Sequence, residues 1–313
     1  MLPRVGQTRL IHPELPVDLD LTLGLFVRGR HDRCTRRDAT GAWWRALRTP
    51  EGPATLRLSR DGAAVRAESW GPGSDWALES APELVGASDR LDGFAPVGLV
   101  AELARRLPGL RVPRARTVFQ CLLLPILEQK VTGSEAWQSY TALQRALGEP
   151  APGPLELLLP PDPKAVATLP SFEYRALGIE GKRADTLVAA AKRARRLEEL
   201  PAMELPAAHQ RLRAIAGIGP WTSAEVARVA LGDADAVSIG DYNLPSLVAY
   251  NLLGEERADD ARLLELLEPF AGHRGRVCLL LMLGGRSVPR RGPRLAARPF
   301  ARERRGAGRR PAS

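Results

Sequence analysis

One short stretch of the sequence, residues 212–224, restricts the fold more than any other. It reads LRAIAGIGPWTSA, in which two apolar helical patterns meet at a Gly-Ile-Gly turn. Gly217 and Gly219 can adopt backbone conformations closed to other residues, and they leave the neighbouring amides without side-chain cover. Pro220 suits the first turn of the second helix. We therefore expect a tight helical hairpin whose second helix directs free N–H groups outward, an arrangement that suits a phosphate.

The two glycines would also serve in an ordinary helical hairpin, so the Gly-x-Gly pair alone does not decide between the two interpretations. The full spacing is more informative. Leu212, Ile215 and Ile218 supply an apolar face, with Ile218 closing the turn, and the small Ala224 stands where the helices must cross closely. This spacing favours the binding of a DNA phosphate over a purely structural turn.

The hydrophobic periodicity changes once along the chain. Residues 1–85 contain short segments that alternate between apolar and polar side chains, separated by turns rich in Gly and Asp. These segments, one of which is 19–27, predict a modest antiparallel sheet. From about 91 to 285 the apolar residues recur at helical spacing instead. The predicted class is therefore α+β, with a small N-terminal antiparallel β domain (1–90), an all-helical domain (91–285) and a disordered basic tail (286–313).

Within the helical part, the segment 114–133 is apolar almost all round, so it is predicted to be one long helix buried on all sides. The next helix is expected to begin at Ser134 as its N-cap and to end at Gly148. Further helices are predicted over 98–107 and 181–200, among others.

The net charge of +9 suggests nucleic acid, but its distribution weakens that inference. Residues 286–313 contain ten Arg and one Glu. Subtracting these from the 45 basic and 36 acidic residues leaves 35 of each, so the rest of the chain is formally neutral. The tail would add salt-dependent attraction to phosphates. It would equally fit a solvated segment in a chain that favours arginine, since only four lysines occur.

Cysteine and histidine usage argues against a metal centre. The three cysteines, Cys34, Cys121 and Cys278, are too few for an iron–sulfur cluster held by four thiolates, and the four histidines lack ligand spacing. Cys121 and Cys278 lie in apolar runs, where buried, inert thiols are expected. Neither a membrane span nor a signal peptide is evident. We expect a cytoplasmic monomer without a cofactor.

Four collinear motifs between about 112 and 285 resemble the helix-hairpin-helix DNA glycosylase superfamily, and within it the bacterial 3-methyladenine (alkylpurine) DNA glycosylases. Besides the hairpin, they are ILEQKVTGSEAW (126–137), LGIEGKRADTLVAAA (177–191) and DAVSIGDYNLP (235–245). In the N-terminal domain the resemblance is weaker, although related enzymes carry a small antiparallel sheet there. The resemblance implies double-stranded DNA with alkylated bases as the partner and base flipping as the mode of access.

Asp241 matches the position of the family's catalytic aspartate, which stabilises the cationic sugar formed as the N-glycosidic bond breaks. The chemistry is reasonable, because a carboxylate there stabilises charge that develops only in the transition state. As an isolated residue before an apolar helix, Asp241 would be interpreted as an N-cap. The two roles are compatible, since a cap fixes the carboxylate at one helix end.

Trp221 stands where family members with lyase activity have a lysine that attacks the sugar and forms a Schiff base. No lysine occurs after Lys192. The resemblance therefore implies a monofunctional glycosylase without lyase activity.

The resemblance also implies a base pocket and a DNA-contacting surface. Aromatic faces attract cationic bases, and the pocket candidates are Trp221, Glu225, Tyr242 and Met282. Glu225 and Met282 replace a tyrosine and a tryptophan of the best-known enterobacterial pattern; Glu225 could contact an exocyclic amine or be a helix-surface acid. Trp221 and Tyr242 could equally be packing residues. The expected DNA contacts are Gly217, Ile218, Gly219, Thr222, Gln129 and Lys130. Lys130 stands at the place of the wedge that fills the gap left by the flipped base, but the usual wedge is apolar, so Lys130 could bind a phosphate instead.

The sequence thus predicts a glycosylase that excises alkylated purines, of the 3-methyladenine type, in base excision repair. Three alternatives stay open at this stage. The chain could act on another lesion such as a deaminated base, it could bind damaged DNA without catalysis, or it could be a structural protein that binds through its basic tail.

Overall fold

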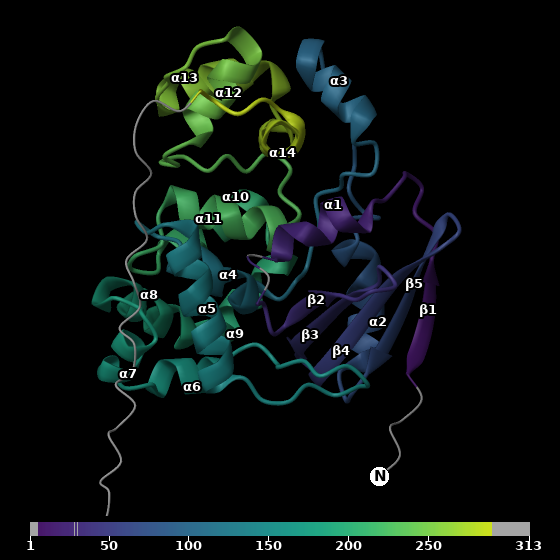
Figure 1. Ribbon diagram of the computed structural model, residues 1–313, viewed down its shortest axis with the longest axis vertical. Helices are drawn as coiled ribbons and strands as arrows, with labels where there is room; N and C mark the ends of the chain where they lie inside the picture. Colours follow the sequence, from purple (N-terminus) through teal and green to yellow (C-terminus); the bar gives the residue numbers. More distant parts are fainter. Residues whose placement is uncertain (1–5, 28, 30, 290–313) are drawn as a thin grey trace, which may run out of the picture.

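The structure, a computed structural model, describes residues 6–27, 29 and 31–289, and places one antiparallel sheet beside a larger group of helices (Figure 1). The strand order is β1-β5-β4-β3-β2, with every neighbouring pair antiparallel. The strands are β1 (Gln7–Ile11), β2 (Thr35–Arg37), β3 (Trp43–Thr49), β4 (Gly52–Asp61) and β5 (Ala64–Trp70). The predicted α+β class with its N-terminal antiparallel sheet is confirmed.

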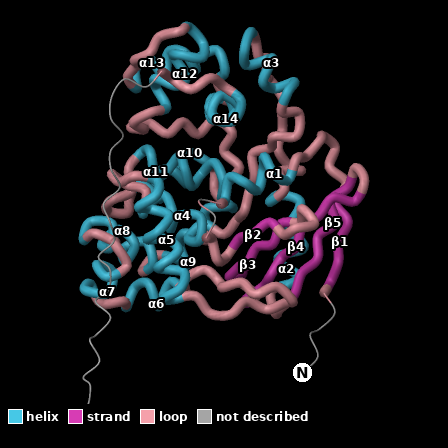
Figure 2. The backbone as a smooth tube through the Cα atoms, viewed as in Figure 1, coloured by secondary structure: helices cyan, strands magenta, loops and turns pink. Residues whose placement is uncertain are grey.

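Helices make up most of the rest of the described chain, and Figure 2 shows the strands gathered on one side of them. The first three are α1 (Leu19–Leu23), α2 (Ser74–Leu84) and α3 (Gly98–Arg106). The middle of the chain forms α4 (Val118–Leu127), α5 (Gly133–Leu147), α6 (Pro163–Thr168), α7 (Ser171–Ala176), α8 (Gly181–Ala191) and α9 (Ala194–Leu197). The last part forms α10 (Leu205–Arg213), α11 (Pro220–Val226), α12 (Leu244–Leu253), α13 (Asp260–Leu267) and α14 (Arg274–Gly284).

Side chains alternate between the two sides of a strand, and both faces of this sheet are covered by other parts of the chain. In β3, Trp43 belongs to the main core, while its neighbour Trp44 packs with Leu157 and Leu159 of the connector that follows α5. The main core runs without interruption from the sheet into α4, so the sheet and the helices share buried apolar surface. The boundary predicted at residue 90 stays a prediction.

The segment 19–27 is helical, so its predicted place among the strands was wrong. It forms α1 followed by a 3₁₀ turn, because Leu19 and Leu23 are buried at helical spacing and Asp18 caps the start. Asp18 Oδ1 accepts hydrogen bonds from the amides of Asp20 and Leu21, at 2.8 and 3.1 Å. The alternation of polar and apolar letters was outweighed by the cap.

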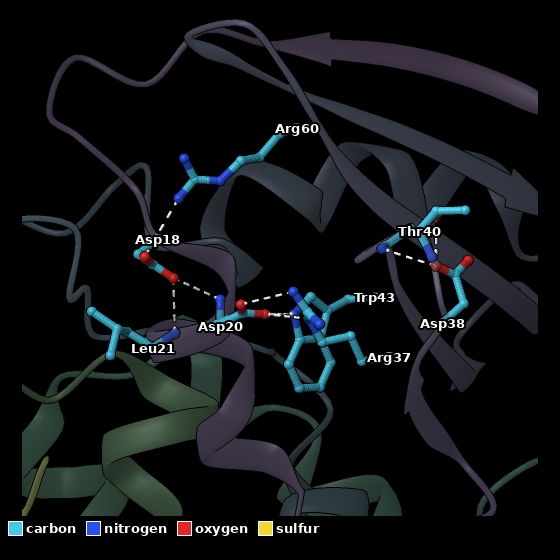
Figure 3. Close-up of polar contacts among 9 residues, drawn as sticks. Asp18, Asp20, Leu21, Arg37, Asp38, Thr40, Trp43 and Arg60 are labelled. Atoms are coloured by element: carbon cyan, nitrogen blue, oxygen red, sulfur yellow. Dashed lines mark hydrogen bonds and ion pairs between the residues drawn. The ribbon is translucent and has the colours of Figure 1, made fainter.

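Asp20 fastens α1 to the sheet (Figure 3). Its carboxylate accepts from Arg37 Nε of β2 at 2.7 Å and from Trp43 Nε1 of β3 at 2.8 Å. We expect Asp20→Ala to lower the free energy of unfolding by about 1 kcal/mol, since three N–H groups, two of Arg37 and one of Trp43, lose their acceptor. Urea unfolding measures this. The control is Glu14→Ala, which breaks only the exposed pair with Arg90 and should change little. Equal losses of unfolding free energy in the two variants would contradict the role of Asp20 in joining α1 to the sheet.

Helix α4 is buried as predicted, but it is shorter than the predicted 114–133. Arg116 before it and Lys130 after it both have positive φ, 61° and 56°, so the backbone leaves the helical region at both ends. The carboxylate of Glu198 accepts from the amides of Val118 and Phe119 and thereby caps the start of α4. A cap eighty residues away along the chain is not visible in the local pattern.

Two further helix boundaries differ from the prediction. Thr132, not Ser134, is the N-cap of α5, because Thr132 and Glu135 form a reciprocal capping box. The segment 181–200, predicted as one helix, is divided into α8 and the short α9 around Lys192. The predicted helix over 98–107 is confirmed as α3.

A second core cluster joins α3 to α12, α13 and α14. Cys34, Cys121 and Cys278 are all buried and free. Within the described residues, no helix has the length and apolar character needed to cross a membrane. The tail predicted over 286–313 lies outside the described residues from 290 onward.

Candidate active site

The Gly-Ile-Gly turn connects α10 to α11, and its two glycines differ in backbone conformation and surroundings. Gly217 has φ of 88°, and a Cβ there would lie 2.0 Å from Thr186 Oγ1, so both the backbone and α8 require glycine. Gly219 is extended, with φ of −95°, and a Cβ there would meet nothing within 4 Å. Only Gly217 is needed for the turn itself. Gly219 leaves open the space in front of the first turn of α11.

As predicted, the second helix of the hairpin begins directly after the turn, and Ile218 closes the turn. Pro220 is the first residue of α11, and Ile218 is 4% exposed, so its side chain closes the turn from inside. Gly217, Gly219 and Pro220 are exposed. The first amides of a helix have no partner within it and carry its positive dipole end. The exposed turn therefore offers an anion-binding surface on the outside of the molecule.

Gln129 braces this turn from the end of α4. Its Nε2 donates to the carbonyl of Gly217 and to Thr222 Oγ1, both at 2.9 Å. Thr222 is 2% exposed, so its hydroxyl faces Gln129 and its side chain is not on the surface. Of the residues expected to contact DNA, these two therefore hold the hairpin in shape, and any contact of Thr222 with a phosphate runs through its backbone.

Lys130 follows Gln129 and is exposed, with its backbone in the left-handed region. For a residue other than glycine this conformation is strained by about 1 kcal/mol, and such strain collects at functional sites. The brace of Gln129 therefore presents Lys130 next to the hairpin. No contact here identifies Lys130 as the wedge, and that role stays a prediction.

Asp241 is held by both its oxygens. Oδ1 accepts from the amides of Asn243 and Leu244 at 2.8 and 2.9 Å, which makes it the capping group at the start of α12. Oδ2 accepts from Trp221 Nε1 at 3.0 Å. Since Trp221 is in the first turn of α11, one hydrogen bond joins the candidate catalytic carboxylate directly to the hairpin. Oδ1 thus accepts two hydrogen bonds and Oδ2 one, so the remaining acceptor site of the carboxylate is on Oδ2.

Glu225 is not a helix-surface acid. It lies one turn after Trp221, its side chain is 16% exposed, and it pairs with Arg228 at 2.9 Å. Ser238, three residues before Asp241, donates to Glu225 and accepts from Arg228. Glu225 therefore connects α11 to the loop that carries Asp241. Behind it, burial raises the pKa of Cys278 to about 12, so that thiol is protonated and inert, as expected.

Tyr242 and Met282 are not part of this network. Tyr242 is 93% exposed, and Met282, on α14, is 54% exposed. The hydrogen-bonded group consists instead of Gln129, Gly217, Thr222, Trp221 and Asp241, with Glu225 beside it. The place of Tyr242 and Met282 in a base pocket stays a prediction.

Three residues near the hairpin escaped the sequence analysis. His209 of α10 bonds through Nδ1 to Ser223 Oγ at 2.7 Å and through Nε2 to Asp233 Oδ2 at 2.8 Å. The order resembles a hydrolytic triad, but Ser223 is fully buried and cannot reach a substrate. The arrangement ties α10, α11 and the following loop together. Sequence separations of 14 and 24 residues give no local signal for it.

Solved structures share this fold. A 3-methyladenine DNA glycosylase from Archaeoglobus fulgidus matches with a TM-score of 0.75 at 19% identity, over 88% of this chain and 97% of its own. An 8-oxoguanine glycosylase/lyase from Clostridium acetobutylicum, in complex with DNA, matches with a TM-score of 0.67 at 13% identity, over 90% and 97%. A 3-methyladenine DNA glycosylase from Schizosaccharomyces pombe, bound to abasic DNA, gives 0.50 at 16% identity, over 61% and 93%.

No family model matches the chain, and no curated protein matches it by sequence. The structural likeness confirms the superfamily resemblance at the level of the fold. In the first two comparisons the match covers 88% and 90% of this chain, so it includes at least part of the N-terminal sheet. The neighbours include glycosylases of two substrate types, so they do not determine which damaged base this chain would recognise.

Proposed function

We propose that this chain, which has the fold of the helix-hairpin-helix DNA glycosylases, is a monofunctional glycosylase that removes alkylated purines of the 3-methyladenine type from duplex DNA. It would act as a cytoplasmic monomer without a cofactor. The proposal is carried by one observation: Asp241 is fixed by Trp221 beside a hairpin whose exposed turn suits a phosphate.

The proposed mechanism follows from this geometry. The hairpin amides bind the backbone phosphate, and a flipped nucleotide brings its sugar toward Asp241. As the glycosidic bond breaks, positive charge develops on the sugar, and the carboxylate of Asp241 stabilises that charge. The leaving base takes the bonding electrons, and water adds to the sugar, releasing a proton. An alkylated purine is already cationic, so its departure needs little acid catalysis.

The choice of lesion is tested with duplexes that each carry a single damaged base. We expect release of 3-methyladenine-type bases, and little release of 8-oxoguanine or hypoxanthine. Quantified free base reports on this directly. Faster release of hypoxanthine or 8-oxoguanine would overturn the substrate class and leave the proposal of a glycosylase intact.

The absence of a lyase step is tested by borohydride trapping. With Trp221 at the position of the lyase lysine, no Schiff base should form, so reduction should give no covalent protein–DNA adduct. A Trp221→Lys variant is an informative companion, because it restores an amine at this place. A trapped adduct with the wild-type protein would contradict the monofunctional assignment.

Trp221 is proposed to position Asp241 in addition to any contact with the base. Trp221→Phe keeps an aromatic ring but removes the Nε1 donor, and we expect it to lower kcat about tenfold. A role limited to stacking on the base would instead raise KM and leave kcat nearly unchanged. Single-turnover rates at saturating protein separate the two outcomes.

A further inference from the structure

A cavity unrelated to the hairpin lies between the sheet and the helices, at the start of α4. Its volume is about 480 Å³, within the range of small-molecule sites. It is lined by the end of β3, the start of α2, the residues before and within the first turn of α4, the loop before α6, and α9. Because Gln129 follows the other end of α4, the ten-residue helix separates the cavity from the hairpin by roughly 15 Å.

The walls of the cavity are mainly apolar. Trp76 and Phe119 contribute aromatic rings, and Pro50, Pro160 and Pro201 are among its rigid proline walls. Rings and prolines of this kind have little side-chain entropy to lose when a planar group packs against them.

The cavity also carries positive charge. Arg116 and Arg195 line it, and the Arg116 guanidinium lies over the ring of Trp76 at 5.7 Å from its centroid. The acid on this side, Glu198, uses its two oxygens to accept from the amides at the start of α4. Arg48 is already engaged by the Pro160 carbonyl and by Glu149. Arg116 lies 4.0 Å from Glu83, so its charge is partly compensated, whereas no carboxylate pairs with Arg195 in the described part of the chain. Arg195 is therefore the lining residue whose charge favours an anion.

Gln120 supplies an unused acceptor. The side chain is 9% exposed and lines the cavity, and its Nε2 donates to the carbonyl of Ala46 at 3.3 Å. That bond leaves Oε1 buried without a hydrogen-bond partner in the described part of the chain. The neighbouring Thr117 hydroxyl is likewise buried, and it interacts with the thiol of Cys121. A buried acceptor without a donor costs about 1–3 kcal/mol, which a ligand N–H would recover after a rotation of the Gln120 side chain that opens Oε1 to the cavity.

Arg116 is strained at the edge of the same cavity. Its φ is 61°, and its amide donates to the carbonyl of Ala230 at 3.0 Å, which holds the conformation. Strained backbone at a cavity wall is typical of binding sites.

From the volume, the aromatic walls, the two arginines and the unpartnered amide oxygen, we propose that this cavity binds a small anion with a flat aromatic group, of the size and chemistry of a purine mononucleotide. The base would lie against Trp76 and donate its exocyclic amine to Gln120, and the phosphate would pair with Arg195 and Arg116. The proposal does not depend on the glycosylase activity.

Calorimetric titration of the full-length protein with AMP, adenosine and inorganic phosphate tests the ligand class. We expect AMP to bind with one-to-one stoichiometry, and adenosine and phosphate to bind at least about tenfold more weakly, because each lacks half of the contacts. No binding of AMP at about 1 mM would overturn the proposal. Equal affinity for phosphate alone would overturn it too, since the aromatic walls would then play no part.

The place of binding is tested with a matched pair on α9. Arg195→Gln should weaken AMP binding about tenfold, whereas Arg196→Gln, at the next exposed residue and outside the cavity lining, should stay within twofold. Gln120→Leu should weaken AMP but not phosphate. Asp241→Asn should leave AMP binding unchanged, which separates the cavity from the candidate active site. Equal effects of the two arginine variants, or loss of AMP binding in Asp241→Asn, would show that AMP binds elsewhere and would overturn the assignment.

Discussion

Replacing Asp241 with Asn is expected to lower the rate of base release by at least about 100-fold while duplex DNA still binds. Asparagine has nearly the same shape, and its oxygen can still accept from the amides of Asn243 and Leu244 that Asp241 Oδ1 now caps. What is lost is the negative charge that stabilises the developing cation. The amide nitrogen would also face Trp221 Nε1, and two donors cannot bond to each other.

The comparison with Trp221→Phe separates these two losses. Trp221→Phe keeps the carboxylate and removes only its orienting donor, so its effect should be about a tenth as large as that of Asp241→Asn. Single-turnover base release and an electrophoretic binding assay give the two numbers. If Asp241→Asn retained the wild-type rate with normal binding, Asp241 would not be the catalytic residue. If it lost binding and stability together, its cap would be the main role.

The second large effect is expected at Gly217, where alanine should destabilise the fold by more than about 2 kcal/mol. The positive φ of 88° costs about 1–2 kcal/mol for any side chain, and the new Cβ would meet Thr186 Oγ1 at 2.0 Å. Chemical denaturation measures the loss. Adding Thr186→Ala should recover part of it, because the clash is relieved and the backbone strain remains.

Gly219→Ala is the matched control, and we expect it to lower DNA affinity and leave stability nearly unchanged. Its backbone is extended and a Cβ there meets nothing, so stability should change by less than about 0.5 kcal/mol. Affinity for duplex DNA should fall about tenfold, since the methyl group stands between the phosphate and the amides of α11. If both glycine variants lost only stability, the turn would be structural, and the phosphate role would be contradicted.

Local patterns in the sequence predicted the features that short stretches control. The hairpin spacing over 212–224, the burial of α4 and the sheet before residue 85 are of this kind, because each depends on side-chain periodicity or on glycine within a few residues. The position of Asp241 before an apolar helix also belongs here. The strand predicted over 19–27 failed because a single cap at Asp18 outweighs a weak alternation.

Contacts between distant segments could not be predicted. The bond from Gln129 to Gly217 joins residues 88 apart, and the cap of α4 by Glu198 joins residues about 80 apart. The bond from Trp221 to Asp241 spans 20 residues, and nothing local specifies it. Such pairs depend on how the helices pack, so the sequence offered candidate residues but not the finding that Gln129 and Thr222 stabilise the hairpin from within.

The central claim is that this chain cleaves a glycosidic bond, and one measurement tests it most directly. Methylated duplex DNA is incubated with the wild-type protein, and the low-molecular-weight fraction is analysed for free bases by mass spectrometry. The account predicts free 3-methyladenine together with strands that carry abasic sites but no breaks. A protein that binds this DNA and yet releases no free base, alkylated or otherwise, would contradict it.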